Sequence, residues 1–401
     1  MKILHTADWH IGRQFHNVSL LEDQRHVLAQ IIDLLRQEAV DVMIIAGDIY
    51  DRSVPPADAV KLLDDTLHAI VNDLGVPVIV IAGNHDGAER LGFGSRQLTQ
   101  AGLHIAGPLS DAINPYIHTD AHGEVAFYSL PYMDPATVRN VFEVDIHGFD
   151  EAMVFMTDRI KAYHAATHPN SRSVVISHCF LSGGEASDSE RPLSVGGADQ
   201  VSAGQFKAFN YTALGHLHQP QAKGGEHIRY SGSLLKYSFS EAEKNKSVTL
   251  IDLQADGSCQ INELPLVPLR DMRPVDGTMA EILAKGKTDP HNHDYVLVRL
   301  LDTEAILDPM GKLRAVYPNV LHLEKPNLRA SSDRVVPDQD MLRKNGLQLF
   351  EDFFRQVTEG ELRDDQRLHL VALIDDIQRH SGDDVDADAN KPAASAGETT
   401  P

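Results

Sequence analysis

The sequence has only two cysteines in 401 residues, Cys179 and Cys259. A disulfide-rich scaffold is therefore excluded, and we expect both thiols to be reduced. Cys179 directly follows His178. Because neighbouring residues of a strand point to opposite faces, we expect this thiol to pack in the core.

Long apolar runs are also lacking. No apolar stretch reaches the roughly 18 residues that a membrane-spanning helix needs. Met1 is followed almost at once by an apolar run, 3–7, which leaves no room for a removable signal sequence. We therefore expect a cytoplasmic protein, whose 42% of hydrophobic residues can bury a substantial core in two domains with accessory parts.

Positive charge is scarce, with 36 Lys and Arg against 58 Asp and Glu, a net charge of −22. This balance argues against a protein that holds nucleic acid alone by a broad basic surface.

Five short apolar runs are each followed by a polar phrase. The runs lack polar alternation, which is typical of strands buried on both faces. In open α/β sheets ligands bind beyond the carboxyl ends of the strands, so the five phrases can deliver side chains to one crevice. The runs are 3–7, 42–46, 76–82, 174–176 and 211–214, and the phrases are Asp8-Trp9-His10, Gly47-Asp48-Ile49-Tyr50-Asp51-Arg52, Gly83-Asn84-His85-Asp86, Ser177-His178 and Gly215-His216-Leu217-His218.

The phrases offer carboxylate oxygen, amide oxygen and imidazole nitrogen without thiolate, a set that suits Mn²⁺ or a related divalent ion better than structural zinc. Asp8 and His10 are two residues apart, so in an extended segment both would face one ion. His218 stands in the same relation to His216. Any one of the 21 histidines is more often a surface or core residue, so the conjunction of phrases carries the prediction of a shared metal site.

In this order the phrases resemble the calcineurin-like metallophosphoesterase superfamily, over about residues 1–235. The resemblance implies a two-sheet sandwich flanked by helices, and two metal ions, which together can activate a water nucleophile and neutralise charge. One ion would be held by Asp8, His10, Asp48 and His218, and the other by Asp48, Asn84, His178 and His216, with Asp48 as the bridge.

The same resemblance implies three catalytic residues. His85 would stand beside the leaving oxygen and give it a proton, since imidazole titrates near neutrality. The alternative is that His85 only shapes the turn. Asp51 would orient this histidine and Arg52 would bind phosphate, while Asp86 either shapes the turn or supports a ligand.

A second resemblance covers more of the chain, to about residue 380. It is to the break-repair nuclease family, and it is carried by the first twelve residues, the stretch 187–193 and the C-terminal layout. This implies a Mn²⁺-dependent DNA phosphodiesterase of DNA repair, recombination and replication, with Mg²⁺ or another divalent ion as an alternative. The activities would be 3′ to 5′ exonuclease on duplex ends and endonuclease on single strands and hairpins. The chain would act as a homodimer within a heterotetramer with an SMC-like coiled-coil ATPase, which could supply most phosphate contacts.

We expect a phosphoesterase core at 1–265, with one apolar helix stripe at 27–35 and another at 60–74 after Pro55-Pro56. Runs 228–230, 247–253 and 259–264 suggest strands of a second sheet. A polar, Gly-rich stretch, 183–197, could close over nucleic acid, meet the partner or be an inert loop.

The remaining chain divides into three expected parts. A Pro- and charge-bearing linker, 265–276, leads to a small α/β cap at 275–335, with strands at 295–300 and 320–323 and a helix at 308–316. The cap would select DNA shape or only stabilise the core. Amphipathic helices at 338–380 would bind the ATPase or pack on the cap, and the acid-rich tail at 381–401 would be disordered.

Two other functions use the same residues. A calcineurin-like phosphodiesterase or phosphatase for small molecules needs the same site and suits the acidic surface better. A scaffold that regulates the ATPase would need no working site, but every ligand position is filled.

Overall fold

The computed structural model describes residues 1–110, 113–190, 199–304 and 306–326, with seven further positions between 363 and 373. The chain divides into two compact units, 1–326 and 327–401. Apart from those seven positions, the predicted partner-binding helices at 338–380 and the predicted tail at 381–401 lie outside the described residues. The predicted loop at 183–197 is described only as far as residue 190.

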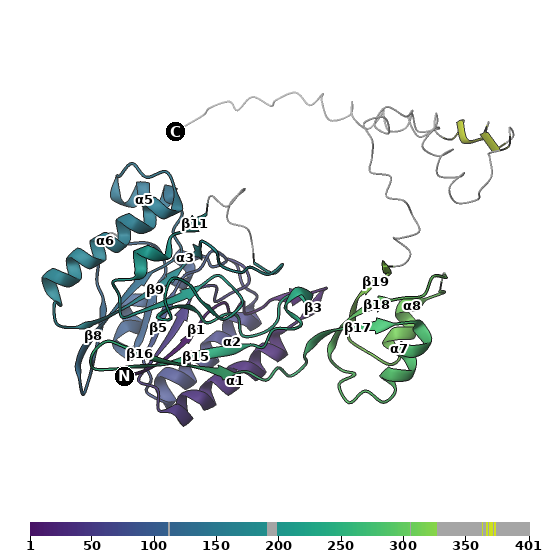
Figure 1. Cartoon of the computed structure of the whole chain (residues 1–401), viewed down its shortest axis with the longest axis horizontal. Helices are drawn as coiled ribbons and strands as arrows, with labels where there is room; N and C mark the ends of the chain where they lie inside the picture. The colour runs from purple at the N-terminus through teal and green to yellow at the C-terminus, as the bar shows by residue number, and fades with distance from the viewer. Residues whose placement is uncertain are drawn as a thin grey trace, which may run out of the picture. The chain divides into compact units, whose positions relative to one another are not determined.

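Two six-stranded sheets face each other in the first unit (Figure 1). Across the first sheet the strands are β16 (Cys259–Pro265), β15 (Ser247–Leu253), β1 (Lys2–Thr6), β4 (Val42–Ala46), β5 (Val78–Ile81) and β6 (Leu103–Ala106). Across the second they are β13 (Gln221–Ala222), β14 (Ile228–Tyr230), β12 (Tyr211–Gly215), β9 (Arg172–His178), β8 (Gly123–Leu130) and β7 (Tyr116–Asp120). The predicted two-sheet sandwich is confirmed.

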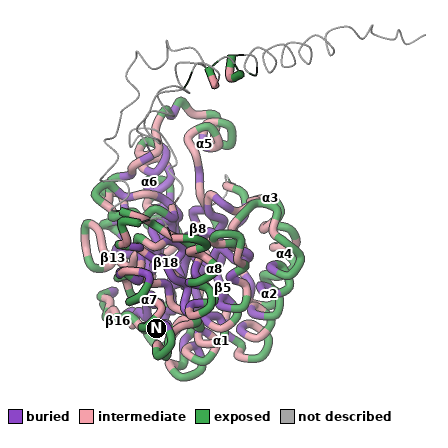
Figure 2. The backbone as a smooth tube through the Cα atoms, turned by 90° about the vertical axis from the view of Figure 1, so that its right-hand side faces the viewer, coloured by how far each residue is buried: buried purple, intermediate pink, exposed green. Residues whose placement is uncertain are grey.

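Apolar side chains fill the space between the sheets. Ile44 and Ile79 of the first sheet belong to one buried cluster with Phe127 and Ile176 of the second. The opposite faces of both sheets are covered by helices, so β4, β9 and β12 are buried along their whole length, as predicted. Figure 2 shows buried backbone inside the first unit and exposed backbone at its rim. Removing apolar surface from water on both sides of each sheet is the main stabilising contribution to the fold.

Helices α1 (Leu21–Glu38) and α2 (Ala57–His68) pack on the first sheet. The predicted stripe of α1 is confirmed in that Val27, Ile31 and Leu35 are buried. Pro56 is the N-cap residue of α2, directly before its first residue, and has an extended backbone with φ of −63° and ψ of 151°. The second predicted stripe is wrong at Val60, which is 45% exposed.

Helices α5 (Pro135–Phe142) and α6 (Phe149–Thr167) lie on the second sheet, where they bury residues such as Val138, Met153 and Ile160. Shorter elements connect the main ones. They are β2 (Gln14–Phe15), β3 (Val18–Ser19), the π-turn η1 (Ala69–Asp73), α3 (Ala88–Leu91), α4 (Ser95–Leu98), η2 (Thr99–Ala101), β10 (Phe180–Leu181), β11 (Gln200–Val201), η4 (Ala203–Phe206) and η5 (Phe239–Glu241).

Strands β15 and β16 correct one sequence expectation. The runs at 247–253 and 259–264 form strands as predicted, but they join the first sheet instead of the second. The reason is the edge of β1, along which β15 pairs antiparallel from Lys2↔Asp252 to His5↔Thr249. Run 228–230 does lie in the second sheet, as β14.

A smaller three-stranded parallel sheet follows, made of β17 (Met272–Gly277), β18 (Tyr295–Leu300) and β19 (Val320–Glu324), with α7 (Met279–Gly286) and α8 (Pro309–Arg314). Strand 295–300 is confirmed at its predicted bounds. The prediction of a linker at 265–276 is wrong for its last five residues, which belong to β17. There Met272 and Val275 are buried and pair with β18. The Tyr295 hydroxyl donates to Asp23 Oδ2 of α1 at 2.8 Å, which joins this small sheet to the core.

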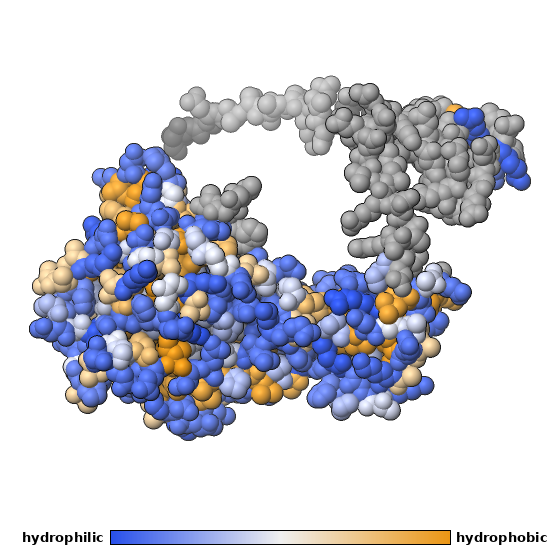
Figure 3. Space-filling view, viewed as in Figure 1, coloured by the Kyte–Doolittle hydropathy of each residue, from blue (hydrophilic) through white to orange (hydrophobic). Residues whose placement is uncertain are grey.

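No helix among the residues that the structure describes is both long and apolar enough for a membrane span. Figure 3 shows hydrophilic side chains over most of the visible face of the first unit.

The five strands that precede the polar phrases share one direction within each sheet. β1, β4 and β5 are parallel neighbours in the first sheet, and β9 and β12 are parallel neighbours in the second. At their carboxyl ends the two sheets touch, since His178 Nδ1 of β9 lies 2.9 Å from the carbonyl oxygen of Ala46 of β4. The polar phrases therefore converge at one edge of the sandwich.

Candidate metal centre

The loop after β1 does not have the extended form that the sequence expectation assumed. Asp8 and His10 have φ of 53° and 45°, in the left-handed region. This happens because the Asp8 and His10 N–H groups donate to the carbonyls of Gly47 and Asp48 in the loop after β4. Asp48 itself has φ of 51°, and such conformations in residues other than glycine cluster at functional sites.

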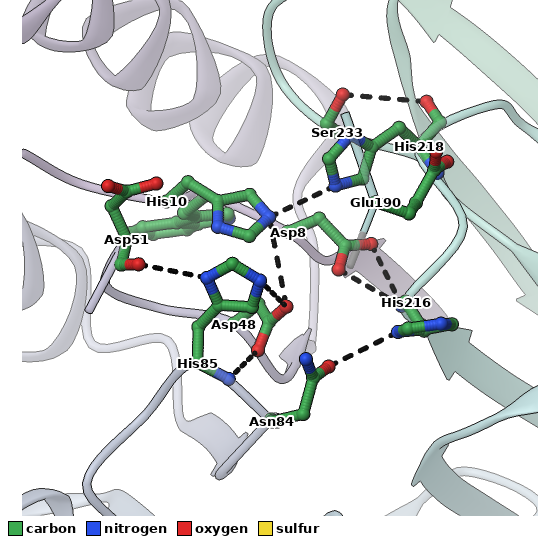
Figure 4. Close-up of polar contacts among 12 residues, drawn as sticks. Asp8, His10, Asp48, Asp51, Asn84, His85, Glu190, His216, His218 and Ser233 are labelled. Carbon is green, nitrogen blue, oxygen red and sulfur yellow. Dashed lines mark hydrogen bonds and ion pairs between the residues drawn. The ribbon is translucent and has the colours of Figure 1, made fainter. Parts of the chain in front are cut away.

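The first group of predicted ligands is Asp8, His10 and His218. Their ligand atoms lie within 4.8 Å of one another, and His10 Nε2 is 3.0 Å from His218 Nε2 (Figure 4). The Asp8 carboxylate also accepts from the His216 N–H at 3.0 Å, which ties the loops after β1 and β12 together. Two imidazole nitrogens and a carboxylate that face one point suit a divalent ion.

The second group surrounds Asn84. Asn84 Oδ1 lies 2.9 Å from His178 Nε2 and 3.2 Å from His216 Nδ1. Asp48 Oδ2 lies between the two groups, 3.5 Å from His178 Nε2 and 3.7 Å from His10 Nε2. The seven predicted ligands thus lie together, with the Asp48 carboxylate between the two groups.

Burial controls the electrostatics of this centre. It raises the pKa of Asp8 to about 7 against the opposing effect of nearby imidazoles, and it lowers the pKa of His216 to about 3. Burial also disfavours the charged forms of Asp48 and His178, but their mutual attraction outweighs it. The pKa of His178 is therefore raised to about 9 and that of Asp48 is held well below its usual value. Buried carboxylates need compensating positive charge, so the residues fit metal cations.

Two glycines allow the sheets to approach at the centre. A Cβ on Gly215 would lie 1.9 Å from the carbonyl oxygen of Ala46, and one on Gly47 would lie 2.3 Å from His178 Nδ1. The approach lets His178 donate from Nδ1 to the Ala46 carbonyl, which leaves Nε2 available as a ligand.

His85 is 4% exposed, and its Nε2 lies 3.9 Å from Asp48 Oδ2. The main-chain N–H of His85 donates to Asp48 Oδ1 at 2.8 Å, and the imidazole Nδ1 lies 2.8 Å from the main-chain carbonyl oxygen of Asp51. The carbonyl can therefore set the ring orientation. The Asp51 carboxylate accepts from Arg13 Nη1 at 3.1 Å, while the Arg52 side chain is 55% exposed and 4.0 Å from Asp51 Oδ2.

The contacts of Asp86 fit both roles that the sequence left open, because it binds within its own turn and in the loop that carries Asp48. Its carboxylate accepts three main-chain N–H groups, from Gly83, Ile49 and Tyr50, at 2.9–3.1 Å. It thereby fixes the loops after β4 and β5 against each other.

Several residues that support the site were not predicted from the sequence. Gln24 of α1 donates to the His10 carbonyl at 2.7 Å and accepts from the Gly12 N–H at 3.0 Å. Ser189, which lies in the stretch 187–193, and Glu241 lie behind His218. No local pattern marks Gln24 or Glu241, because their partners are distant in sequence.

Comparisons with known families agree with this geometry. Residues 1–220 match the family described as calcineurin-like phosphoesterase, and residues 268–358 match the type 5 capsule protein repressor C-terminal domain, SbcD_C. Among solved structures, a dimetal phosphatase from Danio rerio is 12% identical, with a TM-score of 0.42, covering 67% of this chain and 96% of that one. A protein from Thermus thermophilus is also 12% identical, with a TM-score of 0.37, covering 65% and 98%.

A curated relative covers nearly the whole chain. The SbcD subunit of the SbcCD nuclease from Staphylococcus epidermidis is 33% identical over 378 residues, which are 93% of this chain and 99% of the relative. The family matches cover both the phosphoesterase core and the region after it. The chain therefore belongs to the SbcD family of nuclease subunits, which is built on the calcineurin-like phosphoesterase fold.

Proposed function

We propose that this chain is the Mn²⁺-dependent nuclease subunit of a DNA end-processing complex. It would cleave duplex ends as a 3′ to 5′ exonuclease, and single strands and hairpins as an endonuclease. The observation that carries the proposal is the cluster of seven predicted ligands around Asp48, of which all but Asn84 are buried. Asp8, His10, Asp48 and His218 would hold one ion, and Asp48, Asn84, His178 and His216 the other.

Two bound divalent ions would supply an activated water nucleophile and neutralise charge on the reacting phosphate. The chain's own residues orient the groups and move the proton. His85, oriented by the Asp51 carbonyl, would hold a proton at Nε2 and give it to the leaving alkoxide. Arg52, whose side chain is largely exposed, would contact the phosphate.

The partner we propose is SbcC, the SMC-like coiled-coil ATPase of the complex, bound through residues 338–380. Two copies of each chain would form a heterotetramer in the cytoplasm, associated with the nucleoid when on DNA. The name of the curated relative and the match at 268–358 support this partnership. The net charge of −22 favours a partner that supplies most phosphate contacts.

A small-molecule phosphodiesterase remains the second candidate, because the acidic composition favours it. The region after the core argues against it, since 268–358 matches a domain associated with SbcD. A regulatory scaffold is the third candidate, and the presence of all seven predicted ligands close together argues against it.

The test is Mn²⁺-dependent cleavage of end-labelled duplex and hairpin DNA by the full chain, with and without its ATPase partner, beside a small aryl phosphodiester. We expect DNA cleavage that the partner enhances. Turnover of the small ester alone in every condition would support the small-molecule enzyme instead. Absence of turnover on every substrate would support the scaffold.

A further inference from the structure

The outer edge of the His218 ring is held by side chains from two distant segments. His218 Nδ1 lies 2.5 Å from Ser189 Oγ, and Ser189 Oγ lies 2.5 Å from Glu241 Oε1. The other Glu241 oxygen lies 2.5 Å from Lys246 Nζ, which donates to the His218 carbonyl at 2.7 Å. These contacts form a closed network, called here the His218 network, that begins and ends at His218.

The His218 network is buried, with Ser189, Glu241 and Lys246 only 6%, 3% and 6% exposed. Buried polar contacts that satisfy one another are strong and specify one arrangement. Lys246 offsets the charge of Glu241, so the pair can stay ionised inside the protein.

The surrounding groups decide the direction of the hydrogen bonds at Ser189. Its Oγ lies 2.8 Å from Ser187 Oγ and 2.5 Å from the ionised Glu241 carboxylate, which can only accept. The Ser189 hydroxyl proton therefore goes to Glu241, its shorter and charged contact, while the Ser187 proton goes to Glu190. Ser189 Oγ then has only lone pairs for His218, and His218 Nδ1 must carry the proton that it donates. The tautomer with Nδ1–H leaves the His218 Nε2 lone pair facing His10 and Asp8.

A second contact fixes the main chain of the same residue. Glu190 Oε1 accepts from the His218 N–H at 2.8 Å, and Glu190 Oε2 accepts from the Ser187 hydroxyl at 2.6 Å. The segment 187–190 therefore holds both the imidazole ring and the main chain of His218. His178 differs, because a main-chain carbonyl holds its Nδ1.

We propose that Ser189 and Glu241 are positioning residues for one of the two metal ions. They hold His218 in the tautomer and orientation that a ligand needs. Outer partners of this kind change metal affinity by about 10–100-fold when they are removed. The inference rests on the proposed function, since it assumes the two-metal centre.

The test is Mn²⁺ binding to the metal-free full chain, followed by the electron paramagnetic resonance signal of unbound Mn²⁺. For Ser189→Ala we expect one of the two Mn²⁺ ions to bind about 10-fold more weakly while the other keeps its affinity. Glu241→Gln should weaken the same ion. Ser238→Ala is the matched control, because its hydroxyl contacts Ser240 and no metal ligand.

Since Glu241→Gln leaves Lys246 without its charged partner and can fail to fold, Ser189→Ala alone decides the outcome. Two Mn²⁺ bound by Ser189→Ala with affinities within about twofold of the unmodified chain would overturn the inference, as would an equal loss at both ions. Either result leaves the proposed function standing. Failure of the unmodified chain to bind Mn²⁺ would overturn the proposed function and this inference with it.

Discussion

The Asp48 carboxylate lies between the two groups of predicted ligands, so in the proposed centre both metal ions would depend on it. We expect Asp48→Ala to lose Mn²⁺ from both positions and to reduce hydrolysis to background. Metal analysis after dialysis and a cleavage assay measure the two effects. Asp33→Ala, at a carboxylate 61% exposed on α1, is the control. Two Mn²⁺ retained by Asp48→Ala would disprove the bridging role.

The His85→Gln variant tests whether His85 gives a proton to the leaving group. We expect His85→Gln to keep Mn²⁺ and DNA binding but to lose about 100-fold or more in DNA cleavage, the range of general acid catalysis. An aryl ester has a better leaving group, so its hydrolysis should fall less. Parallel turnover assays on DNA and the aryl ester measure this difference. Equal losses on both substrates would instead assign His85 a structural role.

At the residue scale the sequence predicted which side chains meet but not how they are held. The polar phrases were noticed because each follows an apolar run, and the resemblance to metallophosphoesterases then implied the seven ligands within them. The structure places all seven close together. The left-handed backbone at Asp8 and His10 was not predictable, because it depends on pairing with the loop after β4. Gln24 and Glu241 were missed for the same reason, since their contacts span long sequence separations.

Strand β1 carries a buried histidine, His5, that is not a predicted ligand. Burial lowers its pKa to about 3, and its ring contacts the Tyr211 hydroxyl and the Leu214 carbonyl. In the unfolded chain this histidine takes up a proton near its ordinary pKa of 6.5, whereas in the folded chain it stays neutral until about pH 3. The folded state therefore loses stability as pH falls through this window, by at most about 1.4 kcal/mol per pH unit.

His5→Gln removes the titration, so the stability difference between the unmodified chain and the variant should shrink as the pH falls from 7.5 to 5. Urea unfolding of both proteins without metal, at several pH values, measures it. The other histidines titrate in both proteins and cancel. A difference that does not change with pH would contradict the prediction.

The close approach of β4 and β12 predicts an effect on stability. Gly215→Ala places a methyl group 1.9 Å from the Ala46 carbonyl oxygen, so the sheets must move apart. We expect a loss of about 1–3 kcal/mol in the free energy of unfolding, as in other overpacked sites. Gly148→Ala, where an added Cβ meets nothing within 4 Å, is the control, and denaturant unfolding of both measures the difference. Equal stability of the two variants would show that the sheets are not in tight contact there.

At the element scale, apolar runs predicted strands well because burial on both faces leaves an uninterrupted apolar sequence. The runs at 42–46, 228–230 and 247–253 match observed strands at both ends. Sheet membership was harder, since β15 joins the first sheet through long-range pairing with β1. β17 was taken for a linker because its sequence bears Pro274 and the charged residues Arg273 and Asp276, although Met272 and Val275 are buried.

The whole molecule carries a net charge of −22, which limits its own affinity for DNA. We expect the isolated chain to bind duplex DNA with a dissociation constant in the micromolar range or weaker at physiological salt, as in non-specific binding. The ATPase partner should tighten binding. Fluorescence anisotropy across a salt series measures both, with a non-binding protein of similar charge as the control. Nanomolar, salt-resistant binding by the chain alone would contradict the expectation.

The predicted ligands come from positions 8 to 218 and from both sheets, so they lie together only after the strands that carry them have assembled. A nascent or partly unfolded chain holds at most scattered ligands, and metal binding then belongs to the free energy of folding. Nuclease activity would therefore be coupled to folding. An incompletely folded chain would not cleave chromosomal DNA, and activity would appear only once the chain has folded.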